Sequence, residues 1–319
     1  MVAFIVRRLM ISVVVLFAIS MVLFALLQLM PGDPAQIMID PFSFSGDREA
    51  AIERRRAQLG LDQPLAVQYV RWMGELLQGN LGYSFGSGQA VFDIMTGRLA
   101  ATTRLMSFSM GIAMLVGIPD GIVAALRRNT VVDYSATFVS LVAISVPSFF
   151  VALAGIYVFG LKLGWLPTAG MNRTGGDGGL VDSLRYLVLP GSILGFALAG
   201  PYVRYARASM LEVLGQDFLV TARSKGLSRR YVITRHALRN ALIPLVTVIA
   251  IQIPSLFAGA VVIEQIFAWP GMGRMALDAI AVRDYPILLG FVMAAAVLVL
   301  LCNLAADIAY AVIDPRIRL

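Results

Sequence analysis

Six long apolar stretches, separated by charged segments, dominate the pattern of the chain. A helix rises about 1.5 Å per residue, so roughly 20 apolar residues are needed to cross a hydrocarbon core of about 30 Å. We therefore expect an all-α membrane protein with six transmembrane helices. They cover residues 9–30, 105–126, 134–161, 186–203, 241–263 and 286–306. Pro190 and Pro201 predict kinks or helix ends in the fourth, which is the shortest.

The composition agrees with a membrane location. The chain is 59% hydrophobic and 14% charged, whereas soluble domains contain about 25% charged residues. The first apolar stretch follows Arg7 and Arg8 and is too long for the apolar part of a signal peptide, so we expect a retained helix. Cys302 is the sole cysteine, which excludes an internal disulfide and a thiolate metal cluster.

The basic residues predict the orientation, because Lys and Arg near helix ends remain on the cytoplasmic side. They outnumber acidic residues near residues 7–8, 127–128, 204–240 and 316–318, whereas the intervening segments are nearly balanced. We therefore expect both termini in the cytoplasm. Orientation accounts for the net charge of +7, so the basic pI needs no nucleic-acid partner.

The expected organisation follows from these segments. Residues 1–30 hold the cytoplasmic N-terminus and first helix, and 31–98 form an extracytoplasmic segment with helices over 47–59 and 67–77. Residues 99–310 form the membrane core, interrupted by the cytoplasmic loop 204–240, and 311–319 form a cytoplasmic tail.

The loop 204–240 contains a compact basic and amphipathic stretch. Apolar residues at helical spacing predict a helix from Met210 to Lys225. Gly226 interrupts it with a turn at positive φ, and Ser228 is a good N-cap for a second helix that ends near Leu238. Two interpretations are open: the stretch lies among anionic lipid headgroups, or it presents a defined shape to another protein.

Several sequence blocks in order resemble the B-type permease of dipeptide and oligopeptide ABC importers. The blocks are LMPGDP at 29–34, LGLDQPLAVQYVRWMGELLQGNLGYS at 59–84, GIVAALRRN at 121–129, VPSFFVAL at 146–153, TARSKGLSRRYVITRHALRNALIP at 221–244, EQIFAWPGMGRMALDAIAVRDYP at 264–286 and DPRIR at 314–318. The resemblance implies the type I importer fold in a bacterial or archaeal plasma membrane. The Glu of the loop's Glu-Ala-Ala-like triplet is missing at Thr221, as it is in the peptide-importer branch. The sequence departs from the family pattern at Asn80, where an Asp is usual, and at Asp120, where an aliphatic residue is usual.

The resemblance also implies partners and a role for the loop. A second permease subunit completes the pathway, two subunits bind ATP and Mg²⁺, and an extracytoplasmic binding protein delivers peptide. This chain has no G-x-x-x-x-G-K-[ST] motif, so we expect it to bind no cofactor and to catalyse no reaction. Nickel chelates, glutathione or another small solute remain alternative cargoes. The implied ATPase-coupling residues are Thr221, Ala222, Arg223, Gly226, Leu227, Ser228, Arg229, Tyr231 and His236.

Four residues outside the loop are candidates for the pathway or gate. Asp120 is an acid within an apolar window, and we leave open whether it lines an aqueous cavity or forms a structural ion pair. Pro254 and Ser255 are candidates for pore lining, because Pro254 frees a backbone carbonyl. Glu264, near WPGMG at 269–273, is expected at the outer mouth, where Trp269 is either an interfacial anchor or part of a gate.

Two other functional classes are disfavoured. An intramembrane enzyme needs a motif such as H-E-x-x-H or facing acids in its helices, and the sequence contains no such motif. A secondary transporter normally has charges near the midplane and more helices in repeated halves. His236, the sole histidine, has no partner for a metal site and is expected to pack or hydrogen-bond at the ATPase surface.

Overall fold

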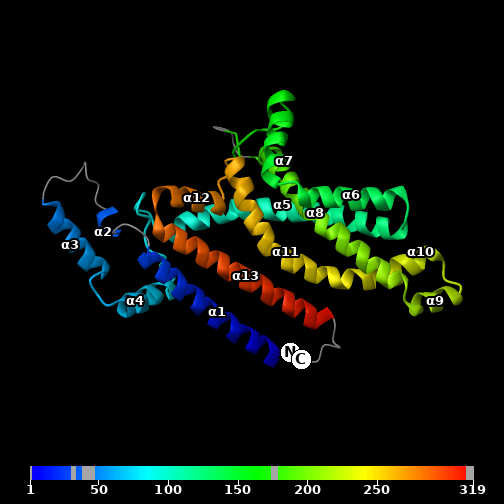
Figure 1. The fold of residues 1–319 in the computed structure, drawn as a ribbon, viewed down its shortest axis with the longest axis horizontal. Coiled ribbons are helices and arrows are strands. Elements are labelled where there is room, and N and C mark those ends of the chain that lie inside the picture. Colours follow the sequence, from blue (N-terminus) through cyan, green and yellow to red (C-terminus); the bar gives the residue numbers. More distant parts are fainter. Residues whose placement is uncertain (1, 30–33, 38–46, 174–178, 314–319) are drawn as a thin grey trace. The chain divides into compact units, whose positions relative to one another are not determined.

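The computed structural model describes residues 2–29, 34–37, 47–173 and 179–313 (Figure 1). Helices account for the regular structure of these residues, and a single isolated β-bridge joins Tyr83 and Ala90. Contacts divide the chain into two compact units. One contains mainly Ala100–Arg274, and the other contains Val6–Leu99 with Met275–Leu298. The predicted tail lies largely outside the described residues, because residues 314–319 are not among them.

The unit of residues 6–99 and 275–298 combines long apolar helices with short charged ones. Its helices are α1 (Val2–Leu29), α2 (Pro34–Ile37), α3 (Arg48–Leu59), α4 (Leu65–Leu77), the start of α5 (Val91–Leu126), most of α12 (Met272–Val282) and the first half of α13 (Tyr285–Ile313). The predicted helices over 47–59 and 67–77 are confirmed as α3 and α4. Asp47 caps α3 by accepting a hydrogen bond from the N–H of Ala50, and Gly60 ends it at φ 68°.

Two polar contacts hold this unit together. The hydroxyl groups of Ser20 in α1 and Tyr69 in α4 lie 2.8 Å apart, and Phe24 packs beside Tyr69. Before α13, the buried carboxylate of Asp284 accepts a hydrogen bond of 2.5 Å from the Ser84 hydroxyl. The first contact ties α4 to α1. The second ties Ser84 to the residue directly before α13.

The unit of residues 100–274 is built around α8. Its other elements are the remainder of α5, α6 (Val131–Ser145), α7 (Ser148–Gly155), η1 (Ile156–Lys162), α9 (Asp217–Ser224), α10 (Arg229–Tyr231), η2 (Val232–Ala237) and α11 (Leu238–Ile266), while α8 itself covers Leu180–Leu214. Helix α8 contacts α6, α7 and α11. Its buried residues form the main apolar core together with buried residues of α5 and α11.

Glycines allow α8 to approach its neighbours closely. Gly117 and Gly121 of α5, four residues apart, lie against the backbone of α8, and a Cβ at either position would overlap it. Gly195 of α8 lies against the Ser109 carbonyl of α5, and Gly200 lies against the Ser140 carbonyl of α6. Small residues at such crossings bring backbones into van der Waals contact, which is a main source of helix association in membranes.

In the part of the chain that the structure describes, five helices are long and apolar enough to cross a membrane, and a bent pair provides a sixth candidate span. The five lie in Val6–Leu29, Val91–Leu126, Val181–Leu214, Arg229–Ile266 and Tyr285–Ile308. The span expected over 134–161 is bent, because α6 and the helix from Ser148 to Lys162 meet at 96°. Pro147 causes the break: it disfavours helical backbone in the preceding residue, and Val146 is extended. Figure 1 shows α7 turning away from α6.

The fourth predicted helix is much longer than 186–203. Helix α8 continues through Pro190 and Pro201 without ending, because close contacts with α5 and α6 hold it in place on both sides. Arg204 and Arg207, expected at the start of a loop, therefore lie on a membrane-spanning helix candidate.

Candidate functional site

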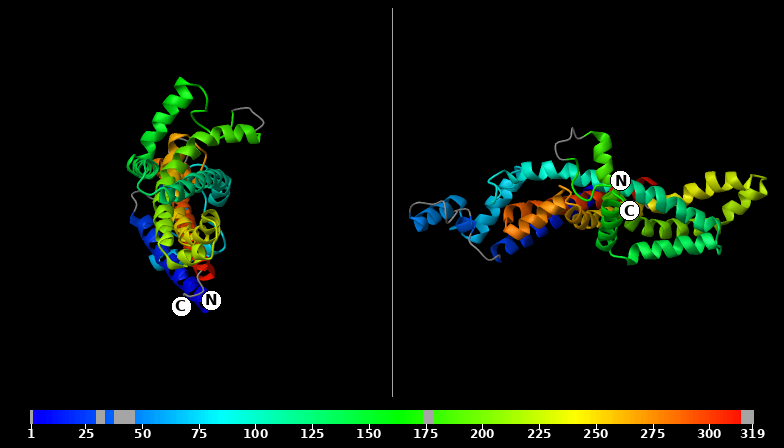
Figure 2. Two further views of the ribbon diagram at one scale, coloured as in Figure 1. Left: turned by 90° about the vertical axis from the view of Figure 1, so that its right-hand side faces the viewer. Right: turned by 90° about the horizontal axis from the view of Figure 1, so that it is seen from above.

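The basic stretch after α8 folds as a helical hairpin. Helix α8 ends at Gly215, and α9 begins at Asp217. The predicted single helix from Met210 to Lys225 is therefore wrong, because the chain leaves helical geometry at Gln216, whose φ and ψ are −86° and 144°. Figures 1 and 2 place α9 and α10 together beyond the end of α8 and beside the start of α11.

The turn of this hairpin has the predicted chemistry. Gly226 adopts φ 78°, and its N–H donates to the Arg223 carbonyl over 2.9 Å. No heavy atom beyond its chain neighbours lies within 4 Å of the position that a Cβ would occupy. Glycine is therefore favoured here because the backbone is left-handed, and not because a side chain would lack space. Ser228 is confirmed as an N-cap, with its hydroxyl accepting a hydrogen bond from the N–H of Tyr231.

The helix after Ser228 does not end near Leu238 as predicted. Helix α10 continues through the π-helical turn η2 into α11, and Arg229–Ile266 is one helical run of 38 residues. The expectation failed because Leu238 to Asn240 contain no helix-ending residue. The basic turn is therefore joined without interruption to a helix that enters the apolar core.

The inner side of the hairpin is firmly packed. Leu219 and Ala222 of α9 meet Val232 and Ala237 of η2, and all four are buried. The same cluster includes Met210 of α8, which is fully buried. This packing fixes the turn to the end of the α8–α11 pair, so the hairpin has a defined shape.

The outer side of the hairpin combines exposed apolar and basic groups. Its exposed large apolar side chains are Phe218, Val220, Leu227 and Tyr231, and its exposed cations are Arg223, Lys225, Arg229, Arg230 and Arg235. The ring of Tyr231 packs edge-to-face against His236, with centroids 5.8 Å apart. Apolar side chains within a basic rim can seat in an apolar groove with an acidic border. Thr221 is also exposed, whereas Ala222 faces inward.

The four pathway candidates separate in the structure. Asp120 is exposed and lines a cavity of about 270 Å³ between α5, α6 and α8, together with Ser135. No basic side chain among the described residues pairs with it. Ser255 is exposed on α11 beside the half-buried Pro254.

Glu264 instead lies at the centre of a buried network. Its Oε2 accepts hydrogen bonds from the N–H groups of Gly273 at 2.7 Å and Arg274 at 3.1 Å. Its Oε1 accepts one of 2.5 Å from the Thr102 hydroxyl, which in turn accepts one from the Met272 N–H. The side chain is 0% exposed, so it anchors the first turn of α12 to α5.

Trp269 is also part of this buried region. Its indole N–H donates to the Ala101 carbonyl over 2.9 Å, and the residue is 1% exposed. The interpretation of Trp269 as an interfacial anchor is therefore wrong. Trp269 and Glu264 together hold the turn WPGMG against the start of the membrane core in the unit of residues 100–274.

Sequence reasoning missed an ion pair between α6 and α8. Arg207 donates to the buried Asp133 carboxylate through Nε at 2.5 Å and Nη2 at 2.9 Å. The N–H of Asn129 donates to the same carboxylate over 3.0 Å. The partners are 74 residues apart, and only the unexpected extension of α8 brings them together.

Among the described residues, no group of three or more His, Cys, Asp and Glu could hold a metal ion.

The comparisons with known proteins agree with this architecture. Residues 117–319 match the family described as binding-protein-dependent transport system inner membrane component, and residues 1–106 match its N-terminal companion family. The chain belongs to the family of binding-protein-dependent transport system inner membrane components. It therefore has the type I ABC transporter fold in its membrane domain.

Full-length relatives have transport names. The chain is 40% identical over 319 residues to the oligopeptide transport system permease protein AppB of Bacillus subtilis, covering 100% of both chains. It is 37% identical over 339 residues to the dipeptide transport system permease protein DppB of Escherichia coli, covering 100% of this chain and 99% of the other. It is 37% identical over 318 residues to the glutathione transport system permease protein GsiC of Escherichia coli, with the same coverage.

A solved structure shows the fold independently. A chain of the MetNI methionine ABC transporter in an inward-facing conformation matches with a TM-score of 0.52 at 17% identity, covering 69% of this chain and 96% of that chain. At this identity the likeness concerns the fold alone.

Proposed function

We propose that this chain is the membrane-spanning permease subunit of an ATP-driven importer for dipeptides and oligopeptides. The observation that carries the proposal is full-length similarity to the oligopeptide permease AppB, at 40% identity over 319 residues. The long apolar helices support the transmembrane role. The chain supplies part of the pathway and takes its energy from separate ATP-binding subunits, which carry ATP and Mg²⁺.

The hairpin of α9 and α10 is the element that transmits this energy. Its apolar and basic outer face seats in a groove of an ATP-binding subunit, with Leu227 and Tyr231 as apolar contacts and Arg223 and Arg229 at the rim. Closure of the ATP-binding subunits displaces the hairpin. The unbroken run from Arg229 to Ile266 carries that displacement into the membrane domain.

The remaining partners and the orientation complete the proposal. Both termini and the hairpin lie in the cytoplasm of a bacterium or archaeon, as the excess of basic residues in these segments indicates. A second permease subunit forms the other half of the pathway, and an extracytoplasmic binding protein delivers peptide. Pro254 and Ser255 face the pathway, and Asp120 lines a cavity beside it.

Glutathione is the second candidate cargo, because the glutathione permease GsiC is 37% identical over 318 residues. Glutathione is itself a tripeptide with a γ-linked glutamate, so both cargoes need a pathway for a short polar chain. Transport assays with both compounds separate the two possibilities.

The decisive experiment measures ATP hydrolysis by the complete complex, reconstituted with its binding protein, with and without peptides. The variant Gly226→Val forces a β-branched residue into left-handed backbone, which costs about 1–2 kcal/mol or more. Gly79→Val is a matched control, because Gly79 adopts φ 81° and lies outside the hairpin. Like Gly226, it has no heavy atom within 4 Å of the position that a Cβ would occupy.

We expect both variants to assemble and only Gly226→Val to lose peptide-stimulated hydrolysis. Equal stimulation in both variants would refute the coupling role of the hairpin. Stimulation of the wild-type complex by glutathione and by no other peptide would reassign the cargo and keep the permease.

A further inference from the structure

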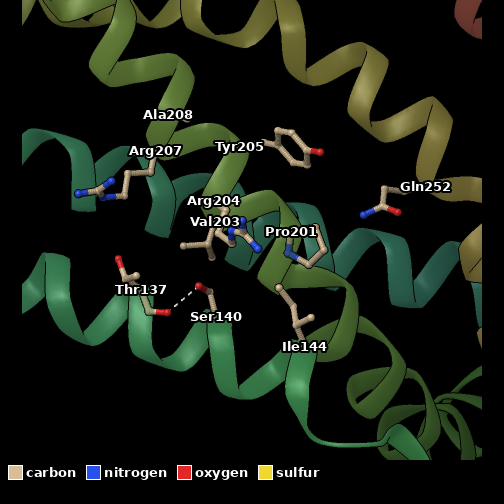
Figure 3. Close-up of a pocket in the computed structure, with 10 residues that line it drawn as sticks. All are labelled: Thr137, Ser140, Ile144, Pro201, Val203, Arg204, Tyr205, Arg207, Ala208 and Gln252. Carbon is tan, nitrogen blue, oxygen red and sulfur yellow. Dashed lines mark hydrogen bonds between the residues drawn. The ribbon is translucent and has the colours of Figure 1, made fainter.

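A cavity with six polar lining side chains opens between α6, α8 and α11 within the unit of residues 100–274. Its volume is about 590 Å³, within the range of small-ligand sites. Figure 3 shows side chains from the three helices around it. The polar ones are Thr137, Ser140, Arg204, Tyr205, Arg207 and Gln252, and aliphatic side chains complete the lining.

The two arginines of this cavity differ in their partners. Arg207 is neutralised by the buried carboxylate of Asp133. Arg204 is exposed, and no acid among the described residues pairs with it. An arginine within a membrane-spanning helix is costly and normally serves a functional purpose. The cavity therefore contains one uncompensated positive charge.

Neutral hydrogen-bonding groups accompany that charge. Ser140 donates to the carbonyl of Thr137 over 2.8 Å, which leaves its oxygen free to accept. Gln252 lies across the opening from Arg204 and Tyr205 (Figure 3), and its amide can both donate and accept. A ligand that carries an anionic group next to amide groups would match this lining, because the arginine can pair with the anion and the neutral groups can hydrogen-bond to the amides.

One wall of the cavity lies at the depth of the hydrocarbon core. Gln252 is in the middle of the apolar stretch 241–263, whereas Arg204 directly follows the apolar stretch 186–203. A phosphate of the bilayer surface does not reach the middle of a spanning apolar stretch. The cavity therefore joins the arginine at the border of one apolar stretch to an amide inside another.

We propose that this cavity is a transit site in which Arg204 pairs with the C-terminal carboxylate of the passing peptide. The inference rests on the proposed peptide cargo. Every linear peptide carries this carboxylate whatever its side chains, so one arginine serves cargoes of many sequences. The carboxylate loses water as it passes between apolar helices, and the guanidinium replaces those lost contacts with charge-assisted hydrogen bonds.

The test compares uptake of alanyl-phenylalanine and of its C-terminal amide into proteoliposomes holding the complete complex. Both compounds are presented at concentrations that saturate the binding protein, so that its own preference does not determine the rate. The variants are Arg204→Gln, which removes the charge, and Arg204→Lys, which keeps it. Arg128→Gln is the control, because Arg128 is an exposed arginine outside the cavity.

We expect the wild type to take up the acid about tenfold faster than the amide, because a charge-assisted pair is worth about one decade or more. Arg204→Gln should slow the acid about tenfold and leave the amide unchanged, while Arg204→Lys keeps most of the preference and Arg128→Gln keeps all of it. If Arg204→Gln does not assemble, the wild type and Arg204→Lys still test the inference. Faster uptake of the acid than of the amide by both would support it, and equal uptake of the two compounds would refute it.

Other outcomes would overturn the inference. An unchanged ratio of acid to amide in Arg204→Gln, or a wild-type ratio near one, would exclude the carboxylate pair while leaving peptide transport intact. The effect of Arg204→Gln on uptake could instead depend on the phosphatidylglycerol content of the liposomes and be equal for the acid and the amide. That result would show that the cavity binds lipid and not the peptide carboxylate. Failure of the wild type to take up either compound would refute the peptide cargo and this inference together.

Discussion

The Glu264 network predicts a strong contrast between two substitutions at one position. Glu264→Ala removes the acceptor for three donors: the Thr102 hydroxyl and the Gly273 N–H, which are buried, and the Arg274 N–H, which is partly buried. Each buried donor left without an acceptor costs about 1–3 kcal/mol, so we expect the two buried donors to cost about 2–6 kcal/mol. Glu264→Gln retains the bonds, because its amide oxygen can accept from both N–H groups while its NH₂ donates to Thr102.

The glutamine variant should therefore cost about 1 kcal/mol or less, in line with an ordinary hydrogen-bond rearrangement. Apparent melting temperatures report the difference, since 1 kcal/mol corresponds to roughly 2–4 °C for chains of about 150–250 residues and to slightly less for longer chains. We expect Glu264→Ala to melt about 10 °C below the wild type. Size-exclusion chromatography of heated complexes, detected through a fluorescent tag on this subunit, follows this chain specifically.

Glu75→Ala is the control for this experiment. Glu75 is 3.5 Å from Arg71 on the exposed side of α4, and such surface pairs contribute about 0–1 kcal/mol. Wild-type stability of Glu264→Ala would refute the role of the network. Equal destabilisation by alanine and glutamine would show that the charge of Glu264, and not its hydrogen bonds, determines stability.

Three further predictions concern helix packing and capping. Gly121→Val should lower stability by about 1–3 kcal/mol through overpacking against α8, whereas Gly111→Val should not, because nothing lies near a Cβ there; thermal melting distinguishes them. Asp133→Ala leaves Arg207 unpaired and should cost up to about 3 kcal/mol, and replacing both residues by leucine should recover most of this loss; a double-mutant cycle measures it. Ser228→Ala removes the N-cap and should cost about 1 kcal/mol, seen as weaker peptide stimulation of ATP hydrolysis in an assembled complex.

The features that the sequence predicted well depend on neighbours along the chain. A spanning helix is recognised by about 20 consecutive apolar residues; α5, α11 and α13 contain the windows expected for them, and α1 contains its window as far as Leu29. Gly226 and Ser228 were also predictable, because a left-handed turn and an N-cap each depend on a few adjacent residues.

The prolines show where local rules stop. Pro147 separates α6 from α7 at a bend of 96°, yet Pro190, Pro201 and Pro254 lie inside continuous helices. The same residue type breaks one helix and is tolerated in others, because packing of the neighbouring helices supplies or withholds support. That packing is not visible in the order of residues.

The networks of Glu264 and Asp133 were hidden for a related reason. Thr102 and Glu264 are 162 residues apart, and Arg207 was expected in a loop beyond its helix. Pairing of polar groups over such distances depends on the three-dimensional crossing of helices. The sequence alone indicated only that an acid was present near each apolar segment.

The uninterrupted run from Arg229 to Ile266 has a mechanical consequence. Its 38 residues make a lever about 57 Å long, so a tilt of about 10° around one end moves the other by about 10 Å. Pro244 and Pro254 each remove a backbone hydrogen bond from this lever, and its stiffness is lowest beside them. The two prolines therefore determine how much of a push at the basic turn reaches the far end and how much is absorbed as bending.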